Sequence, residues 1–471
     1  MKKKALCVML SAAMVATMFT GCGSKDSSKS SSGTNADGSN DSYTYEGASS
    51  DDGTELNIYC WNTEFQSRVA AHYPDYEEVD ETTGKIGDVT VNWVIVANDN
   101  NAYQDNLDSA LSTNGDKQAD AAAADKIDIF LVEADYALKY VNTNYTLSLA
   151  DAGVTDADVA DQYQYTKDVV TDQLGNLKGS SWQGCPGLLF YRRDVATEVF
   201  GSDDAETVQA KVADWDTFVA TAAELKDAGY QITCSANDTY RVYSNNVTSA
   251  WVAGDKVQID ANLDKWVEDS KALVDAGYTG TYDLWSDEWN AGMYMDAKVF
   301  CYFGPAWLIN FCMHAEDAGS VANEGKWGAV VGPQGFYWGG TWICVANGTD
   351  NVSICKDIIL KLTTDVDIMT EIVVDDDDFV NNQPAMEAMA EDTTYSSAVL
   401  GDMNPLALYA EGAKSIEIKY ATIYDQGCNE AFQAAMKDYF EGTVDKATAL
   451  QNFADSVAEK YPNLDVSGLT A

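Results

Sequence analysis

Hydrophobic and polar residues alternate along three segments in the first third of the chain. Residues 55–61, 88–96 and 126–134 carry β-branched and aromatic residues in the pattern of strands. Residues 62–73 and 101–112, which separate them, carry apolar residues at helical spacing. This order of elements predicts a doubly wound α/β layer, in which ligands bind beyond the carboxyl ends of the strands.

Polar and aromatic side chains follow each of these predicted strands. By the rule just given, they form the first group of candidate binding residues. They are Trp61, Asn62 and Glu64 after the first strand, Asn98 after the second, and Glu133, Asp135 and Tyr136 at the end of the third.

Helical spacing dominates the rest of the chain. Residues 214–229 begin at Asp214, a plausible N-cap, and stop at a glycine, and residues 260–277 repeat this pattern. A short strand is expected at 298–303 and another from near Trp342 onward. Residues 353–373 predict an amphipathic helix or a pair of helices, and the last 45 residues predict two helices separated at Gly442.

The N-terminus has the features of a secretory signal. Three lysines precede a short apolar run that ends in "FTGC", which resembles a lipobox, although Phe19 stands where leucine is usual. This pattern predicts a signal peptide over residues 1–21 and a lipid on Cys22. Simple secretion and an uncleaved anchor are the alternatives. Residues 22–53 are rich in Ser, Gly, Asn and Asp and predict a disordered tether.

Length and charge narrow the class of protein. A chain of 471 residues is longer than a single hydrophobic core usually accommodates, so two lobes are expected. The formal charge is −46, and no Lys or Arg cluster occurs after the first four residues. Proteins that bind phosphate backbones need such clusters, so nucleic acid is excluded as a partner and membrane contact is expected through the N-terminal lipid only.

Cysteine and histidine usage argues against redox, metal and nucleophilic chemistry. Eight cysteines remain once Cys7 and Cys22 are set aside, most of them in apolar runs, and no C-x-x-C pair occurs. The eight are therefore expected to be mostly buried free thiols. Only two histidines exist, and the common hydrolase and phosphate-loop motifs are absent. We expect neither an enzyme nor a cofactor.

Four stretches carry a family resemblance. In order along the chain, "PGLLFYRRDVA", "CYFGPAW", "KWGAVVGPQGFYWGGTW" and "NEAFQAAMKDYFEGTVDKATALQNF" resemble segments of the family 1 extracellular solute-binding proteins of ABC importers, the sugar-binding group that includes maltose-binding protein. The resemblance covers most of the chain from about Glu55 to Tyr461. It implies two α/β lobes of the periplasmic-binding-protein type II class, joined by a multi-segment hinge. Lobe one would comprise 54–184 and 343–385, and lobe two 185–342 and 386–471.

Tryptophans and glycines near the predicted lobe boundary are candidate ligand contacts. Aromatic rings suit the C–H faces of a sugar, and glycine lets backbone amides approach its hydroxyls. For each tryptophan the alternative is a place in the core or a cap on the inter-lobe seam. The candidates are Trp61, Trp182, Trp307, Trp338, Gly339, Gly340 and Trp342.

Carboxylates and amides are the candidate partners of sugar hydroxyls. Glu64, Glu133 and Asp135 follow the predicted strands, where the alternative is a solvated helix start. The stretch "DDDDFVNNQPAM", residues 375–386, resembles a loop that faces the cleft in this family. It could instead be a solvated loop or bind calcium. The remaining candidates are Asp378, Asn381, Asn382, Asp425 and Asn429.

These features together predict a monomeric, lipid-anchored substrate-binding component of a carbohydrate ABC importer on the outer face of a Gram-positive type envelope. Its ligand would be a neutral oligosaccharide, because aromatics abound and no Arg or Lys cluster accompanies the candidate residues. A monosaccharide or a polyol is the alternative ligand. A surface glycoside hydrolase and a non-transport carbohydrate adhesin remain alternative functions.

Overall fold

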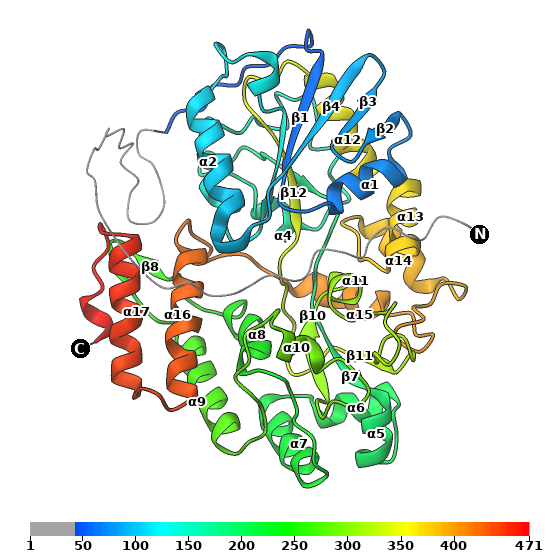
Figure 1. The fold of residues 1–471 in the computed structure, drawn as a ribbon, viewed down its shortest axis with the longest axis vertical. Helices are drawn as coiled ribbons and strands as arrows, with labels where there is room; N and C mark the ends of the chain where they lie inside the picture. The colour runs from blue at the N-terminus through cyan, green and yellow to red at the C-terminus, as the bar shows by residue number, and fades with distance from the viewer. Residues whose placement is uncertain (1–42, 471) are drawn as a thin grey trace.

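The computed structural model describes residues 43–470, which form two lobes built around separate sheets (Figure 1). We call the part around the seven-stranded sheet the first lobe and the part around the three-stranded sheet the second lobe. The mixed α/β class and the division into two lobes agree with the sequence prediction.

The first lobe has a parallel centre and antiparallel margins. Its strand order is β2-β3-β4-β1-β5-β12-β6, with β1 parallel to both β4 and β5. The inward residues of β1, Leu56, Ile58 and Cys60, are buried, as the alternating pattern requires. The strands are β1 Glu55–Cys60, β2 Tyr76–Asp80, β3 Thr83–Ile86, β4 Val89–Ile95, β5 Ile129–Glu133, β6 Ser180–Ser181 and β12 Thr341–Val345.

The helices of the first lobe cover the two faces of this sheet (Figure 1). Residues 353–373, for which the sequence predicted either one helix or a helix pair, form a pair of helices. The helices are α1 Glu64–His72, α2 Ala102–Asn114, α3 Ala137–Val141, α4 Gln164–Asp168, α12 Val352–Thr364 and α13 Val366–Asp376, with 3₁₀ turns η1 Asp99–Asn101 and η2 Ala123–Asp125.

The second lobe contains a small antiparallel sheet. In it β7 (Leu188–Arg192) lies between β10 (Cys301–Gly304) and β11 (Trp327–Val330), and all three strands pair antiparallel. Single parallel bridges join Gln231 to Val299 and Thr233 to Thr279. The sequence predicted a second doubly wound layer in this lobe. Its parallel pairing is limited to these isolated bridges, because the chain at these positions does not form continuous strands.

Helices make up most of the second lobe and of the segments that connect it to the first lobe. Asp214 and Asp260 cap α7 and α9 through their side chains, as predicted. The helices are α5 Arg193–Phe200, α6 Ala205–Lys211, α7 Trp215–Asp227, α8 Tyr240–Ser244, α9 Ala261–Asp275, α10 Asp287–Ala291, α11 Trp307–Phe311, α14 Gln383–Glu391, α15 Leu406–Ser415, α16 Asp425–Phe440 and α17 Lys446–Lys460; the remaining elements are η3 Ala236–Thr239, β8 Val252–Ala253, β9 Lys256–Val257 and η4 Ser467–Leu469.

The segment just before β1 contacts the first lobe along its length. The Tyr43 hydroxyl donates to Asp172, the Tyr45 hydroxyl to Asp151, and the backbone of Ala48 to the Asn347 side chain. Residues 43–53 therefore differ from the disordered tether that the sequence predicted for them. The signal peptide, Cys22 and the rest of the predicted tether lie outside the described residues.

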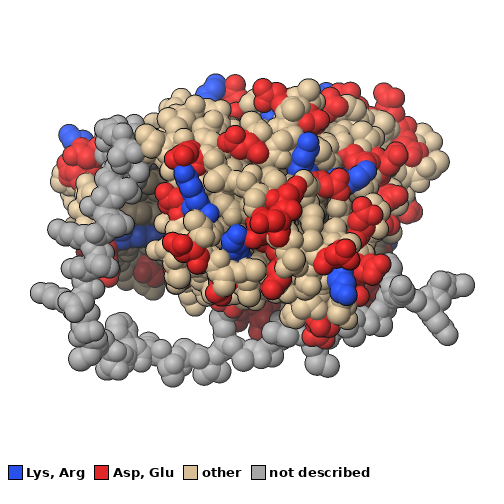
Figure 2. Space-filling view, turned by 90° about the horizontal axis from the view of Figure 1, so that it is seen from above, with Lys and Arg blue, Asp and Glu red and all other residues tan. Residues whose placement is uncertain are grey.

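Two surface and core properties also follow from composition. All eight cysteines of residues 43–470 are buried and unpaired, as predicted. The face seen in Figure 2 carries many Asp and Glu side chains with isolated Lys and Arg among them, and no continuous basic patch. Across residues 43–470, no helix combines the length and apolarity that a bilayer span requires.

Candidate functional site

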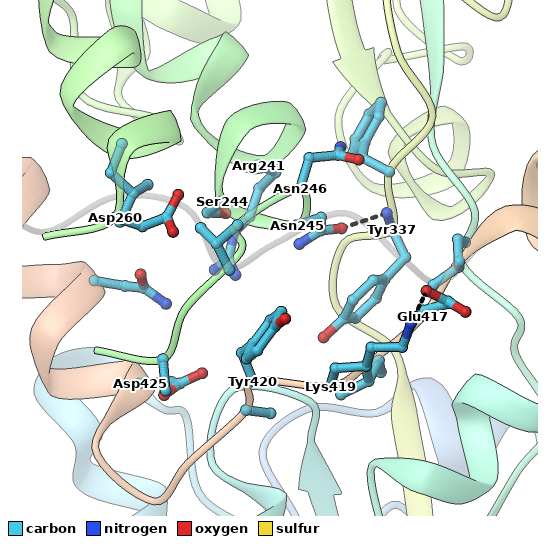
Figure 3. Close-up of a pocket in the computed structure, with 18 of the residues that line it drawn as sticks. Arg241, Ser244, Asn245, Asn246, Asp260, Tyr337, Glu417, Lys419, Tyr420 and Asp425 are labelled. Atoms are coloured by element: carbon cyan, nitrogen blue, oxygen red, sulfur yellow. Dashed lines mark hydrogen bonds and ion pairs between the residues drawn. The ribbon is translucent and has the colours of Figure 1, made fainter. Parts of the chain in front are cut away.

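A cavity of about 390 Å³ lies where the two lobes meet (Figure 3). The first lobe contributes Asp135, which follows β5, and the second lobe contributes the end of α8 and the start of α16. Two connecting segments complete the wall: residues 334–337 before β12, and residues 415–421 between α15 and α16. The parallel register of β1, β4 and β5 explains why Asp135 is there, since their carboxyl ends lie at one edge of the sheet.

An ion pair joins the lobes at the edge of this cavity. Both terminal nitrogens of the Arg241 guanidinium donate to the Asp135 carboxylate, the Nη1–Oδ1 distance being 2.7 Å. The Arg241 guanidinium carbon also lies 5.8 Å from the centre of the Trp338 ring. Arg241 therefore contacts Asp135 in the wall of the cavity and also the ring of Trp338, which lies next to the cavity.

Glu133 ends β5 beside the glycine pair that leads into β12. Burial and the nearby charge of Asp135 raise the pKa of its carboxyl, while the Arg241 charge opposes the rise. A Cβ placed on Gly339 would stand 3.6 Å from Glu133 Oε1 and 3.4 Å from Trp307 Nε1. Gly339 and Gly340 have φ values of 69° and 106°, which glycine alone adopts readily. The loop thus approaches Glu133 closely.

Asp425 begins α16 and lines the cavity. Its Oδ1 accepts hydrogen bonds from the backbone and the hydroxyl of Thr422, at 3.0 and 2.6 Å. Burial raises the pKa of Asp425 to about 7, against these two bonds. A protonated Asp425 can both donate and accept, which suits a hydroxyl group.

Other charged groups around the cavity have partners within the protein. The Asp260 carboxylate accepts from the side chains of Thr248 and Ser249 and from a backbone amide. Lys419 pairs with Glu417 at 2.5 Å. Arg241 and Lys419, the two cations among the lining residues, are thus both paired within the protein, which leaves no free cation among the described residues of the wall to hold an anionic ligand.

Some hydrogen-bonding capacity remains in the wall. The Ser244 hydroxyl is buried and has no hydrogen-bond partner within residues 43–470. Figure 3 shows Ser244 beside Arg241, with Tyr420 and Asp425 on the opposite wall. An unpaired buried hydroxyl costs free energy, and a ligand that bonds to it recovers that cost.

Three tryptophans form an aromatic group next to the cavity. The Trp307 ring lies 5.1 Å from the Trp338 ring, and its Nε1 donates to the Trp338 carbonyl at 3.0 Å. The Trp285 ring centre lies 5.8 Å from Trp307 and 5.7 Å from Trp338. Trp307 is half-buried and Trp338 is buried. The structure therefore brings together two rings that the sequence proposed separately as candidates.

Trp61 and Asn62 lie at the predicted carboxyl edge. Trp61 is half-buried and meets Tyr103 and Tyr136 edge-on, at 5.5 and 6.4 Å. The Asn62 side chain accepts from the backbone of Glu64 and thereby holds the start of α1. Neither is among the residues that line the cavity.

Glu64 belongs to a buried polar network between α1 and residues 376–378. Gln183 donates to its Oε1 at 2.8 Å, and Arg68, which pairs with Asp376 at 2.7 Å, lies 3.8 Å away. Burial raises the pKa of Glu64 to about 7, with Arg68 opposing. Glu64 therefore stabilises the contact between these segments and does not line the cavity.

Trp182 and Trp342 differ from their predicted roles. The Trp182 ring is fully buried and stacks on Phe65 at 5.5 Å. Trp342 is buried in β12, where its Nε1 donates to the Thr166 carbonyl at 2.7 Å. Both rings are core residues because the sheet and its covering helices enclose them.

The acidic loop is also structural. Asp378, Asn381 and Asn382 are buried, and their side chains accept from Gln183, from Tyr163 and from the first turn of α14, respectively. Asp377 accepts from two hydroxyls, and Asp376 pairs with Arg68. These carboxylates have separate partners, and residues 43–470 hold no group of three or more His, Cys, Asp or Glu suited to a metal ion.

Asn429 lines the cavity, but its side-chain oxygen is already used. It accepts from the Tyr240 hydroxyl and from Trp251 Nε1. Asn429 therefore holds Tyr240 and Trp251 in place in the part of the cavity wall that the second lobe forms.

Sequence reasoning missed several cavity residues, above all Arg241. Arg241 stands in "TYRVYSNN", a short polar stretch without a spacing rule that ties it to Asp135. The available signal was the clustering of amide and hydroxyl side chains at the end of that stretch. The other missed residues include Ser244, Asn245, Asn246, Tyr337, Lys419 and Tyr420.

Comparisons with known proteins agree with this architecture. A family model described as bacterial extracellular solute-binding protein matches residues 58–400. A comparison with curated proteins finds no match.

Solved structures match over most of the chain. One, an extracellular solute-binding protein family 1, has 19% identity and a TM-score of 0.68, covering 86% of this chain and 99% of its own. An ABC transporter-associated binding protein from B. animalis subsp. lactis Bl-04, in complex with β-1,6-galactobiose, has 17% identity, a TM-score of 0.65 and coverage of 88% and 99%. The sugar-binding protein MalE from Xanthomonas citri has 13% identity, a TM-score of 0.64 and coverage of 86% and 97%. At these identities the likeness establishes the fold.

Proposed function

Because the chain belongs to the bacterial extracellular solute-binding protein family, we propose that it captures a neutral oligosaccharide between its lobes. The permease of an ABC importer would then receive the sugar from the closed form. The sugar ligand named for the Bifidobacterium relative supports this choice of ligand class.

One observation supports the proposal most strongly. The cavity at the lobe boundary has both of its cations paired within the protein, a buried hydroxyl at Ser244 that has no partner within residues 43–470, several amide side chains, and a tryptophan group beside it. Sugars present hydroxyls around their edges and flat C–H faces, so this arrangement meets both kinds of surface. Asp425, Ser244 and Glu133 would bond to hydroxyls, and Trp307 and Trp338 would cover the C–H faces.

Binding would favour the closed arrangement because contacts come from both lobes. Asp135 lies on the first lobe and Arg241 on the second, and they meet only when the lobes are together. A ligand that contacts both walls shifts the equilibrium by its differential affinity for the closed form.

We propose no catalytic step at this site. Hydrolysis of a glycosidic bond needs two carboxyl groups free to act on the substrate. Asp135 is committed to Arg241 by two hydrogen bonds, and the carboxyl groups of Asp260 and Asp425 accept hydrogen bonds from Thr248, Ser249 and Thr422.

For location, we propose attachment to the outer face of the membrane through a lipid on Cys22, as a monomer. This rests on the N-terminal sequence alone. Metabolic labelling with a radioactive fatty acid tests it: a Cys22→Ser variant should lose the label.

Titration of intrinsic tryptophan fluorescence with neutral mono- and oligosaccharides tests the ligand class. We expect a saturable change with at least one oligosaccharide, because Trp307 and Trp338 lie beside the cavity although they are not among its lining residues. Chromatography of the same mixtures after long incubation should recover the sugar intact. Release of shorter sugars would instead establish a hydrolase, and no saturation by any soluble sugar would favour an adhesin.

A further inference from the structure

Trp285 is an exposed tryptophan held in a fixed position. Its side chain is 51% exposed, and its backbone has a φ of 72°, in the left-handed region. A bulky residue in this conformation is uncommon and costs free energy. Neither a core role nor local backbone preference accounts for a tryptophan here.

The neighbours of Trp285 fix the position of its ring. It lies 5.4 Å from Trp289, which is fully buried, and 5.8 Å from Trp307. Trp289 is itself held by Asp238, which accepts from its Nε1 at 2.7 Å. Trp285 therefore rests on a rigid base, with much of its ring facing solvent.

The ring continues the aromatic group outward from the lobe boundary. Gly339 lies between Glu133 of the first lobe and Trp307, and Trp307 in turn contacts Trp285. Figure 1 shows α10, which follows Trp285, near the end of the second lobe that faces the first. The path from Glu133 through Trp307 to Trp285 thus leads from the boundary toward solvent.

The surroundings of Trp285 favour a hydroxyl-rich occupant over an apolar one. Asp287 and Glu288 are exposed next to it in sequence, as is Asp283, whose carboxylate pairs with Lys437 at 2.6 Å. Carboxylates accept hydrogen bonds from hydroxyls, whereas an apolar protein surface would have to desolvate them. An exposed ring with carboxylates nearby in sequence offers a sugar unit both a flat apolar face and hydrogen-bond acceptors.

We propose that Trp285 stacks against a sugar unit that projects out of the closed cleft, so that the ligand is a linear oligosaccharide longer than the cleft itself. This inference rests on the proposed function, and it deepens that function by adding a second, outer binding position. A ligand enclosed entirely between the lobes would not reach Trp285.

The test compares ligands of increasing length on the full mature chain. Trp285→Asn removes the ring and suits the left-handed backbone, and Trp285→Gly serves as a second variant that relieves any strain. Phe311→Ala, which removes an equally exposed aromatic ring on α11, is the matched control. The probes are two- to six-unit members of the α-1,4-glucan, β-1,4-glucan and β-1,6-galactan series, titrated by calorimetry.

We expect Trp285→Asn and Trp285→Gly to weaken the longer members by about 10-fold, the scale of a partly buried aromatic contact, and to leave the disaccharide unchanged. Phe311→Ala should change neither. An equal loss at every length would place Trp285 inside the cleft, and no loss at any length would remove it from the site; either overturns the inference. If the unaltered protein binds no member of any series, it is the proposed function that fails.

Discussion

Arg241 and Asp135 meet across the lobe boundary, with the Arg241 guanidinium donating to both oxygens of the Asp135 carboxylate. Their side chains retain about a fifth of their exposure, so the pair is neither fully buried nor freely solvated. Because one partner belongs to each lobe, the pair connects the two lobes, and we expect it to stabilise the closed form of the proposed binding cycle. It also fixes Arg241 against Trp338, which couples closure to the shape of the aromatic group.

The first prediction concerns this pair. Asp135→Ala and Arg241→Ala should each weaken sugar binding by about 1–3 kcal/mol, because the closed form loses a bidentate pair and keeps one unpaired charge. The double variant should lose no more than the worse single variant. Calorimetry on all four proteins measures this coupling. Fully additive losses would show that the two residues act separately.

The second prediction concerns the aromatic group. Trp307→Ala and Trp338→Ala should each weaken binding by about 1–3 kcal/mol, the scale of a buried aromatic contact. Leu174→Ala, an exposed apolar residue of the first lobe, serves as the control and should leave affinity unchanged. Fluorescence titration checks all three variants. Unaltered affinity in both tryptophan variants would place the ligand elsewhere.

The third prediction separates backbone strain from a role in binding. Gly339 and Gly254 have similar φ values, 69° and 64°, but a Cβ on Gly254 would meet nothing within 4 Å. Replacement of either by alanine should lower the free energy of unfolding by about 1 kcal/mol. Only Gly339→Ala should also weaken sugar binding, since its methyl group would stand beside Trp307 and Glu133. An equal effect of both variants on affinity would argue against the glycine loop as a ligand contact.

The fourth prediction is a pH dependence at Asp425. Folding raises the pKa of this carboxyl from 3.8 to about 7, mainly through burial, so the folded protein binds the proton more tightly than the unfolded chain. Its contribution to the free energy of unfolding therefore falls as the pH rises from about 4 through 7. Asp425→Asn keeps the Oδ1 acceptor for Thr422 and removes the titration.

At pH 8 we expect Asp425→Asn to be more stable than the unaltered protein by on the order of 2 kcal/mol, with little difference at pH 4. Urea unfolding at fixed ionic strength measures this, since constant salt holds the self-repulsion of the acidic chain steady. Parallel stability profiles for the two proteins across this range would show that Asp425 ionises as freely in the folded state as in the unfolded one.

The local features of the fold were predictable from sequence. β1, β4 and β5 follow from alternation, and the caps at Asp214 and Asp260 follow from side-chain chemistry within three residues. Parallel pairing then placed Glu133 and Asp135 at the carboxyl edge of the sheet, where Asp135 lines the cavity. Each of these inferences needed only neighbours in sequence and one general rule of sheet topology.

The features that failed depend on distant partners. Trp182 and Trp338 both stand near a lobe crossing and both are buried, but Trp182 stacks on Phe65 within the first lobe, whereas Trp338 packs against Trp307 beside the cavity. Arg241 was missed because its partner Asp135 lies 106 residues away in the other lobe. No local pattern records which side chains meet when two lobes close.

Isothermal titration calorimetry of the full mature chain against a panel of neutral and charged saccharides tests the central claim most directly. We predict one-site binding of a neutral oligosaccharide with a negative heat-capacity change, which reports the burial of the tryptophan group and the lobe surfaces. Binding of a charged saccharide alone, or no heat with any member of the panel, would contradict it.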